Sequence, residues 1–241
     1  YDADDYVKST TGMTTPGFST IGETASAVKN LRARGAFTHL SSADGDDATD
    51  RRITEAQIKN FMEAELVVKN DKDVPFYAEN SAALIKYGRF FDGARIGIAL
   101  YGVNPVSGDK TPLLPVMTFR AAVIAINTVK KGDFIGYSRG YRAKKDMRVA
   151  IISTGYADGL PRALSNKGMI FCNGQFLKIV GKVSMDSVAV DAGDADVKIM
   201  DEVVVFGDEI KVTDVANRAD TLPYEILTGV SERVKRVYKN P

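Results

Sequence analysis

Two segments in the first half of the chain carry residue types that could hold an anionic ligand. In "ENSAAL", Asn80 and Ser81 follow an expected strand and begin an expected helix. A helix N-cap alone would explain them, but a hydroxyl beside the amides of a helix start also suits a phosphate. In "ARIGIALYG", Arg95 stands in an apolar strand pattern close to Gly97. A buried arginine needs a partner, and a glycine lets a ligand approach the backbone, so this segment is a second candidate site.

Polar turns in the second half of the chain carry further candidates. The stretch "STGYADGLPR" places a tyrosine, an aspartate and an arginine between two apolar runs. Gly155, Gly159 and Asp158 would by themselves make an ordinary turn. The side chains that such turns do not require are Tyr137 in "FIGYSRGY", Tyr156 and Arg162 in "STGYADGLPR", and Met185 and Asp186 in "GKVSMDSVAVD".

Several common catalytic chemistries are excluded or disfavoured. His39 is the only histidine and Cys172 the only cysteine, which excludes a zinc site made from a His/Cys cluster. The sequence has neither common glycine-rich phosphate loop and no G-x-S-x-G motif for a serine nucleophile. Taken by itself, a lone histidine more often has a structural role than a catalytic one.

The composition is that of an ordinary globular protein. The chain has 241 residues, of which 44% are hydrophobic and 26% charged. Its formal net charge of +1 gives no electrostatic case for binding nucleic acid or an anionic membrane surface. The single cysteine rules out an internal disulfide framework and suits a reducing compartment. With neither a membrane-spanning apolar run nor a signal peptide, we expect a cytoplasmic protein.

The first half alternates strands and helices, which is the pattern of βα units on a parallel sheet. Helices are expected over 22–34, 49–69 and 81–88. Strands are expected over 5–10, 35–44, 74–81 and 94–102. A complete (β/α)8 barrel takes roughly 250 residues, so the ~112 residues of this half would supply only half of one.

The second half contains short strands separated by Gly- and Asp-rich turns, as in an antiparallel barrel or sandwich. The pattern changes at "NPVSGDKTPLLP", which is rich in turn formers. We therefore expect a partial α/β barrel over 1–112 and an all-β domain over 113–241. In the second domain, "GMIFCNGQFLKIVG" predicts a hairpin, and a closing helix is expected over 224–237.

Together these motifs resemble those of alanine racemases, which have an N-terminal α/β barrel that binds pyridoxal phosphate and a following β-domain. The segments that carry the resemblance are "KSTTGM", "THLSSAD", "ENSAAL", "ARIGIALYG", "GYS", "GYADGLPR", "GKVSMDSVAVD" and "YEILTGVSERVKRVY". The resemblance implies the C-terminal half of a (β/α)8 barrel followed by an antiparallel β-domain. It also implies an isomerase that interconverts L- and D-alanine and supplies D-alanine for peptidoglycan.

The resemblance assigns cofactor-binding roles to the first half. Arg95 matches the residue that faces the pyridine nitrogen of pyridoxal phosphate. Because an arginine stays protonated, it cannot hand that nitrogen a proton, which disfavours side reactions of the substrate carbanion. His39 matches the histidine that supports this arginine, which reverses the structural interpretation given above. The other residues implied in cofactor binding, chiefly of its phosphate, are Asn80, Ser81, Gly97, Ile98 and Tyr224.

Racemisation needs two bases on opposite faces of the substrate Cα. In the family one base is the lysine that holds the cofactor, and the other is a tyrosine of the partner subunit, which Tyr137 matches. A tyrosine pKa near ~10 makes a poor base at neutral pH, and the His39–Arg95 pair would stabilise the phenolate. Met185, followed by Asp186, matches the residue whose amide contacts the substrate carboxylate. One site then draws on two chains, so the resemblance implies a homodimer.

A corridor for the substrate is also implied. Tyr156 and Arg162 match residues that line the path to the cofactor, where a tyrosine narrows the passage and an arginine attracts a carboxylate. Lys182 stands at the position of a second corridor arginine. The charge is kept there, but the bidentate fork of an arginine is lost.

The sequence also departs from the family at the cofactor lysine and around Lys8. The segment resembling "KANAYGHG", which carries the cofactor lysine, has no counterpart here. We therefore expect a fragment of a longer racemase that is inactive alone, with an inactive racemase-like binding protein as the alternative. Lys8 matches a lysine that is often carbamylated and holds a substrate-binding arginine. Thr10 stands where the family has an aspartate, and Thr15 stands where it has that arginine. A carbamylated Lys8 would therefore lack its partner, and binding of the substrate carboxylate should weaken.

Two other activities stay open. The serine racemases of glycopeptide resistance share these motifs, so serine is an alternative substrate. A decarboxylase of basic amino acids could use the same scaffold and cofactor, but "GYADGLPR" and the compact Met185–Asp186 turn favour a racemase.

Overall fold

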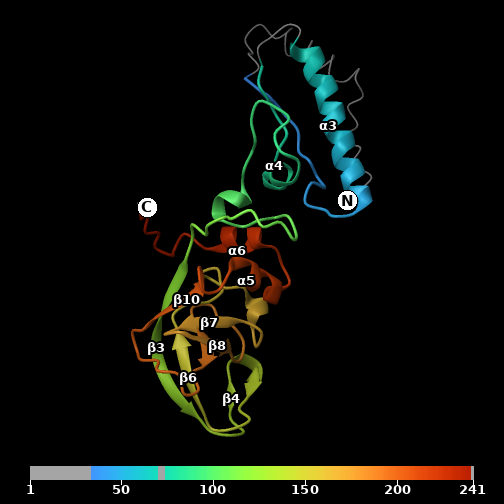
Figure 1. The fold of residues 1–241 in the computed structure, drawn as a ribbon. Helices are drawn as coiled ribbons and strands as arrows, with labels where there is room; N and C mark the ends of the chain where they lie inside the picture. The colour runs from blue at the N-terminus through green and yellow to red at the C-terminus, as the bar shows by residue number, and fades with distance from the viewer. Residues whose placement is uncertain (1–33, 70–73, 240–241) are drawn as a thin grey trace. The chain divides into compact units, whose positions relative to one another are not determined.

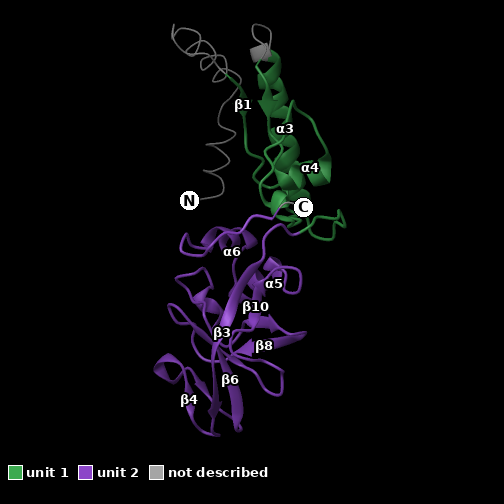
Figure 2. Ribbon diagram, turned by 90° about the vertical axis from the view of Figure 1, so that its left-hand side faces the viewer, with its two compact units in different colours: residues 1–114 green, residues 115–241 purple. Residues whose placement is uncertain are grey.

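The computed structural model describes residues 34–69 and 74–239. The chain forms two compact units, 1–114 and 115–241 (Figure 2). The expected strand over 5–10, nearly all of the expected helix over 22–34, and Lys8 with Thr10 and Thr15 lie outside the described residues.

Unit 1 contains parallel strands joined by a helical crossover (Figure 1). Strand β1 (Ala36–Phe37) pairs in parallel with β2 (Phe76–Tyr77), and helix α3 (Ala48–Lys69) connects them. Helix α4 (Ser81–Tyr87) follows β2 directly. The expected helices over 49–69 and 81–88 and the parallel pairing are confirmed, although both strands are much shorter than expected.

An aromatic cluster forms the centre of the unit 1 core. Phe61 of α3 packs against Phe76 of β2 and against Phe91, with ring centroids 5.1 and 5.0 Å apart. All three rings are buried. The core therefore lies between the sheet and its helices.

The expected strand over 94–102 is wrong for most of its length. Gly93 forms a parallel bridge with Tyr77 of β2, and Arg95 N donates to Glu79 O at 2.7 Å. Beyond this point, residues Ile98–Tyr101 form a 3-10 helix, η1. The extended chain stops here because the amides of the following residues turn toward the hydroxyl of Ser81, as described below.

Unit 2 is built on a closed barrel with the strand order β10-β3-β6-β9-β8-β7. All its pairings are antiparallel, which confirms the expectation for this half. The strands are β3 (Phe119–Val129), β6 (Met147–Ile152), β7 (Met169–Cys172), β8 (Gln175–Ile179), β9 (Val188–Asp191) and β10 (Glu202–Phe206). Fully buried side chains in the barrel core include Val123, Ile152, Ile170, Ile179, Val190 and Val203.

Unit 2 contains two hairpins, one within the barrel and one in a separate two-stranded sheet. Strands β7 and β8 form the expected hairpin through Asn173 and Gly174, whose φ angles of 46° and 81° suit the two-residue turn for which this pair is favoured. Strands β4 (Phe134–Ile135) and β5 (Tyr141–Arg142) form a smaller hairpin, closed by the 3-10 helix η2 (Tyr137–Arg139).

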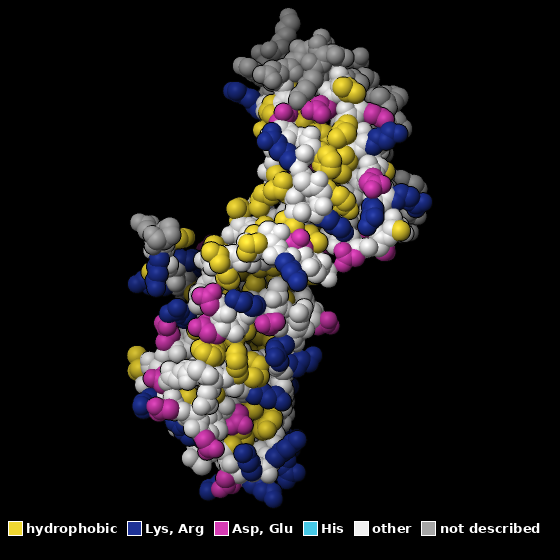
Figure 3. Space-filling model, in the orientation of Figure 1, with side chains coloured by type: hydrophobic (Ala, Val, Ile, Leu, Met, Phe, Trp, Pro, Cys, Tyr) yellow, Lys and Arg dark blue, Asp and Glu magenta, His cyan; other side chains and the backbone are white. Residues whose placement is uncertain are grey.

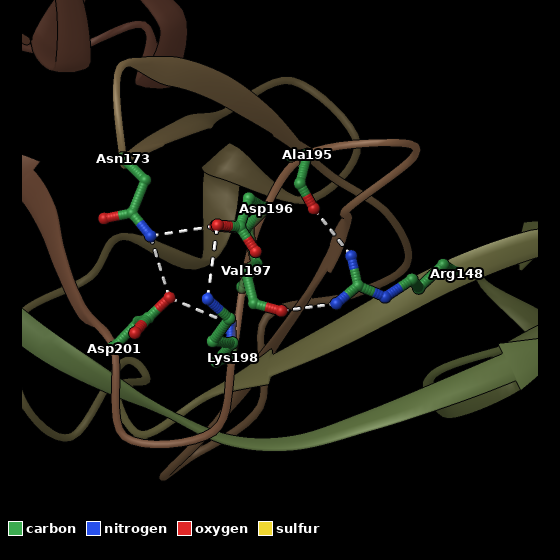
Figure 4. A network of polar contacts seen from close by, with 7 residues as sticks. All are labelled: Arg148, Asn173, Ala195, Asp196, Val197, Lys198 and Asp201. Atoms are coloured by element: carbon green, nitrogen blue, oxygen red, sulfur yellow. Dashed lines mark hydrogen bonds and ion pairs between the residues drawn. The ribbon is translucent and has the colours of Figure 1, made fainter.

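The long connection between β9 and β10 is fixed by polar contacts rather than by secondary structure (Figure 4). Arg148 of β6 donates through Nη1 to Ala195 O at 2.7 Å and through Nη2 to Val197 O. Asp201 Oδ2 accepts from Asn173 Nδ2 at 2.8 Å. The start of β10 is thereby held next to the β7–β8 turn.

The C-terminal end differs from the expected single helix over 224–237. Helix α5 (Val212–Ala219) was not expected, and α6 (Pro223–Gly229) ends early. Beyond Gly229 the side chain of Arg236 donates to Val230 O at 2.8 Å and to Ser231 O at 2.6 Å. Side-chain donors thus satisfy carbonyls that a continued helix would pair with its own amides.

Among the described residues, no helix is both long enough and apolar enough to cross a membrane.

Truncating the barrel core should destabilise unit 2 strongly. Ile170 is 0% exposed on β7, so Ile170→Ala should lower the free energy of unfolding by about 2–5 kcal/mol through lost burial and a new cavity. Ile199, which is 58% exposed, offers the same substitution as a control and should change stability by less than about 0.5 kcal/mol. Urea unfolding of both variants checks this, and equal losses would contradict the assigned core.

Candidate functional site

Ser81 joins the start of α4 to the segment that follows Arg95. Its hydroxyl oxygen accepts hydrogen bonds from Gly97 N at 3.1 Å and from Ala99 N at 3.3 Å. Between these two, the amide of Ile98 has no hydrogen-bond partner among the residues that the structure describes. A Cβ placed on Gly97 would meet nothing within 4 Å. A buried hydroxyl, backbone amides and open space above a glycine therefore lie together.

Asn80 fixes the position of this cluster. Its Oδ1 accepts from Ala83 N at 2.9 Å, so it caps α4, and its Nδ2 donates to Leu40 O at 2.9 Å. The residue thus ties the start of α4 to the end of the β1 segment. The capping role and the attachment to β1 are both fulfilled by one side chain.

Arg95, which follows the bridge at Gly93, forms a pair with His39, which follows β1. Arg95 Nη2 donates to Thr38 O at 2.6 Å and lies 3.2 Å from His39 Nδ1. Its guanidinium also lies over the ring of Phe37, 5.0 Å from the centroid. The expectation that Arg95 is buried is wrong. Phe37 is 70% exposed, so both side chains lie on the open face of the sheet, opposite the core.

The contact with Arg95 determines the state of His39. A guanidinium can only donate, so the neighbouring Nδ1 must accept and the proton must reside on Nε2. Partial burial of the ring and the Arg95 charge lower the pKa of His39 below its ordinary value of 6.5, and Asp44 opposes this shift. Near neutral pH the imidazole is therefore uncharged.

In unit 2, the loops of Tyr156 and Met185 are joined directly. Tyr156 N donates to Ser184 O and Ala157 N to Met185 O, both at 3.0 Å. A Cβ on Gly155 would lie 2.3 Å from both of these carbonyl oxygens, so only glycine permits this approach. Tyr156 and Met185 themselves are about half exposed at the joined loops.

Arg233 is a residue of this region that sequence reasoning missed. Its Nε lies 2.8 Å from Asp158 Oδ1, and its Nη2 lies 2.6 Å from Asp186 Oδ1. Hydrogen bonding to Asp186 and the charges of both carboxylates raise the pKa of Arg233 above its ordinary value. It stands in the charged run "SERVKR", where no feature of the spacing distinguishes it from its neighbours.

Tyr137 lies in the turn of the β4–β5 hairpin and is 71% exposed. The two residues after it, Ser138 and Arg139, have φ angles of 53° and 55°, in the left-handed region that is unfavourable for side-chain-bearing residues. The guanidinium groups of Arg139 and Arg142 each lie 5.8 Å from the ring centroid of Phe134 on the same hairpin. Lys and Arg side chains also gather at the lower end of unit 2 (Figure 3). The turn thus presents an exposed tyrosine in a basic, conformationally strained setting.

The Tyr137 turn is connected to the segment that leads to Met185. Asn166 Nδ2 donates to Gly140 O at 3.0 Å, and Gly181 N donates to Asn166 Oδ1 at 2.7 Å. Lys182 follows directly and is partly buried. Asn166, like Arg233, was missed because its partners are distant in sequence.

The remaining candidates occupy defined positions in unit 2. Arg162 is exposed and begins the 3-10 helix η3 (Arg162–Leu164). Ser165 Oγ donates to Arg162 O at 2.6 Å and accepts from Val183 N at 3.0 Å, which joins η3 to the segment of Lys182. Tyr224 is half exposed at the start of α6. Within the described ranges 34–69 and 74–239, no three His, Cys, Asp or Glu side chains form a metal-binding group.

Comparison with protein families gives matches over both units. The model for "Alanine racemase, N-terminal domain" matches residues 5–105, and that for "Alanine racemase, C-terminal domain" matches residues 116–238.

Curated relatives carry the same name. An alanine racemase from Halothermothrix orenii is 36% identical over 224 residues, covering 89% of this chain and 58% of the relative. One from Aquifex aeolicus is 34% identical over 232 residues, covering 96% of this chain and 65% of the relative. The chain thus spans less than two thirds of the length of these relatives.

Solved structures agree with this result. The alanine racemase from Bartonella henselae with covalently bound pyridoxal phosphate has a TM-score of 0.81 and 31% identity, covering 94% of this chain and 62% of that one. The enzyme from Streptomyces coelicolor A3(2) has a TM-score of 0.85 and 29% identity, covering 93% and 62%.

The Arg95–His39 contact predicts how the only histidine titrates. We expect the pKa of His39 to lie below 6.5, and Arg95→Met to raise it because one cause of the shift is removed. Arg52→Met, at an exposed position of α3, should leave it unchanged. NMR titration of the ring protons measures this without ambiguity, since the chain has a single histidine.

The same shift has a consequence for stability. The folded chain binds the His39 proton less readily than the unfolded chain. The contribution of neutral His39 to the free energy of unfolding is therefore fully present above pH 6.5 and is lost as the pH falls through the lowered pKa of the folded chain. An unshifted histidine in the wild-type chain, or an Arg95→Met variant with the wild-type value, would contradict the assignment.

Proposed function

Because the chain belongs to the alanine racemase family, we propose that it is part of an isomerase that interconverts L- and D-alanine with pyridoxal phosphate. The observation that carries this proposal is the cluster of Ser81 with the backbone of Gly97 and Ala99, next to the Arg95–His39 pair. Such an enzyme would supply D-alanine for peptidoglycan. Serine stays the alternative substrate.

The donor set of the cluster fits the phosphate of the cofactor. A phosphate is held by hydroxyls and backbone amides. The Ser81 hydroxyl accepts from the amides of Gly97 and Ala99 and keeps its own proton to donate, and the neighbouring Ile98 amide is the further donor. The open space above Gly97 leaves room for such a group. From unit 2, Tyr224 is the further phosphate ligand in this proposal. When bound, pyridoxal phosphate withdraws electrons from the substrate and thereby acidifies its α-proton.

Arg95 would face the pyridine nitrogen of the cofactor. It carries a permanent charge and donates to Thr38 O, which holds the guanidinium in one orientation. His39 accepts from the same guanidinium while remaining neutral near pH 7, so it adds no second positive charge. The pair would also stabilise the phenolate of the catalytic tyrosine.

Tyr137 would remove or return the α-proton on one face of the substrate. It is exposed in a strained turn, which suits a residue that acts on a site outside its own unit. The family places this tyrosine in the partner subunit's contribution to the site, so we propose a homodimer. The lysine that acts on the other face would come from the family segment that this sequence does not contain.

The substrate carboxylate would bind at the amide of Met185. This amide has no hydrogen-bond partner among the described residues, and the side chain is 51% exposed. Tyr156, Arg162 and Lys182 would line the approach to it. A cytoplasmic location belongs to the same proposal and suits the buried free thiol of Cys172.

The 241-residue chain alone should be inactive. Without the cofactor lysine, we expect no exchange of the alanine α-proton with solvent. We also expect that borohydride reduction does not attach pyridoxal phosphate to the chain in a 1:1 ratio. A complete alanine racemase assayed in parallel provides the positive control. If the chain alone both fixed the cofactor and exchanged the proton, the assignment of a missing base would be wrong.

In a protein that joins this chain to the family's lysine segment, Tyr137→Phe should slow the removal of the α-proton from one enantiomer of alanine only. For that enantiomer the rate should fall by at least about 10²-fold, which is the usual contribution of a general base. The rate for the other enantiomer should fall far less. Exchange of L- and D-alanine in deuterated water measures the two separately. Tyr141→Phe, on the same hairpin, should leave both rates nearly unchanged. Equal losses for both enantiomers with Tyr137→Phe would refute the two-base assignment.

A further inference from the structure

Arg233 connects the two loops that carry the proposed substrate contacts of unit 2. It pairs with Asp158, in the loop of Tyr156, and with Asp186, which follows Met185 directly. The Nε and Nη2 atoms each serve a different carboxylate, at 2.8 and 2.6 Å. One guanidinium therefore links the corridor loop to the carboxylate subsite.

The charge at this subsite is unfavourable for an anionic ligand unless it is compensated. Asp186 is adjacent to the Met185 amide, and its side chain is 60% exposed. A substrate carboxylate at that amide would meet this negative charge at short range. The repulsion grows where the ligand displaces the intervening water. A cation held on Asp186 removes this obstacle.

Arg233 is held in place by its own segment. Arg236 donates to Val230 O and Ser231 O, and Ser231 N donates to Asp158 O at 3.2 Å. The guanidinium is thus presented from a turn that is already attached to the Asp158 loop. A lysine would keep the charge, but its single ammonium group lacks the planar fork that reaches two carboxylates at once.

We propose that Arg233 is a positioning residue of the substrate-carboxylate subsite, neutralising Asp186 beside the Met185 amide and locking that turn to the Tyr156 loop through Asp158. This inference rests on the proposed function, because it takes the Met185 amide as the carboxylate subsite. Arg233 itself does not contact the substrate in this account. Its effect on anion binding passes through Asp186.

Acetate is the probe for this inference, with the amide signals of Met185 and Asp186 followed by NMR in the 241-residue chain. Arg233→Met should weaken acetate binding about fivefold, because the Asp186 charge is then uncompensated. The double variant Arg233→Met/Asp186→Asn should return to near the wild-type affinity. Asp186→Asn alone should bind acetate at least as well as the wild type. Arg120→Met removes an arginine that pairs with Glu202 on the barrel, and it should have no effect.

Hydrogen exchange reports the locking role independently. The Gly155 amide donates to Asp158 Oδ2 at 2.9 Å and the Ala157 amide to Met185 O at 3.0 Å. Both amides should exchange faster with solvent in Arg233→Met than in the wild type. In Arg233→Lys, acetate affinity should stay near the wild-type value while both amides still exchange faster.

The outcomes separate the two proposals. If acetate shifts no amide near Met185 even in the wild-type chain, the carboxylate subsite of the proposed function is wrong, and the inference about Arg233 falls with it. If wild-type acetate binding is present but unchanged in Arg233→Met, or if the double variant stays weak, Arg233 does not act through Asp186. The proposed function would survive that result.

Discussion

The loops of unit 2 depend on the close approach of Gly155 to the carbonyls of Ser184 and Met185. No side chain fits between them, since a Cβ would lie 2.3 Å from each oxygen. This contact allows the amides of Tyr156 and Ala157 to reach the same two carbonyls. The loop of Tyr156 and the proposed carboxylate subsite are therefore held together by main-chain hydrogen bonds.

Unit 1 uses a side chain for the equivalent purpose. The Ser81 hydroxyl gathers the amides of Gly97 and Ala99, and Asn80 attaches the same turn to Leu40. A phosphate bound there would take the Ser81 hydroxyl and the Ile98 amide as donors that these contacts hold next to each other. Such preorganisation lowers the cost of ordering the site when the ligand binds. Each unit thus carries a prearranged group of residues, consistent with a family whose site draws on both kinds of domain.

Much of the fold follows from local patterns in the sequence. Short apolar runs separated by Gly/Asp turns predicted the antiparallel strands of unit 2, and "GMIFCNGQFLKIVG" predicted a hairpin. Helix α3 followed from its periodicity. The family resemblance also predicted that His39 supports Arg95, and these two side chains are in contact. These features depend on neighbours in sequence or on a pattern that a family shares.

The errors arise where distant residues override the local pattern. The apolar run after Arg95 was expected to be a strand, but the Ser81 hydroxyl captures its amides and η1 forms instead. The helix expected to continue past Gly229 ends because the Arg236 side chain takes the carbonyls there. Arg233 was missed because its partner Asp186 is 47 residues away in the chain. Long-range polar contacts of this kind leave no periodicity to detect.

The central claim, that unit 1 holds the phosphate of pyridoxal phosphate, is tested most directly by titrating the chain with inorganic phosphate. This probe avoids the aldehyde, which would react with exposed lysines. The account predicts that the amide signals of Gly97, Ile98 and Ala99 shift together, that Ser81→Ala abolishes the shifts, and that Ser107→Ala, at an exposed serine, does not. Shifts that persist unchanged in Ser81→Ala, or that appear only near Arg139 and Arg142 of the β4–β5 hairpin, would contradict it.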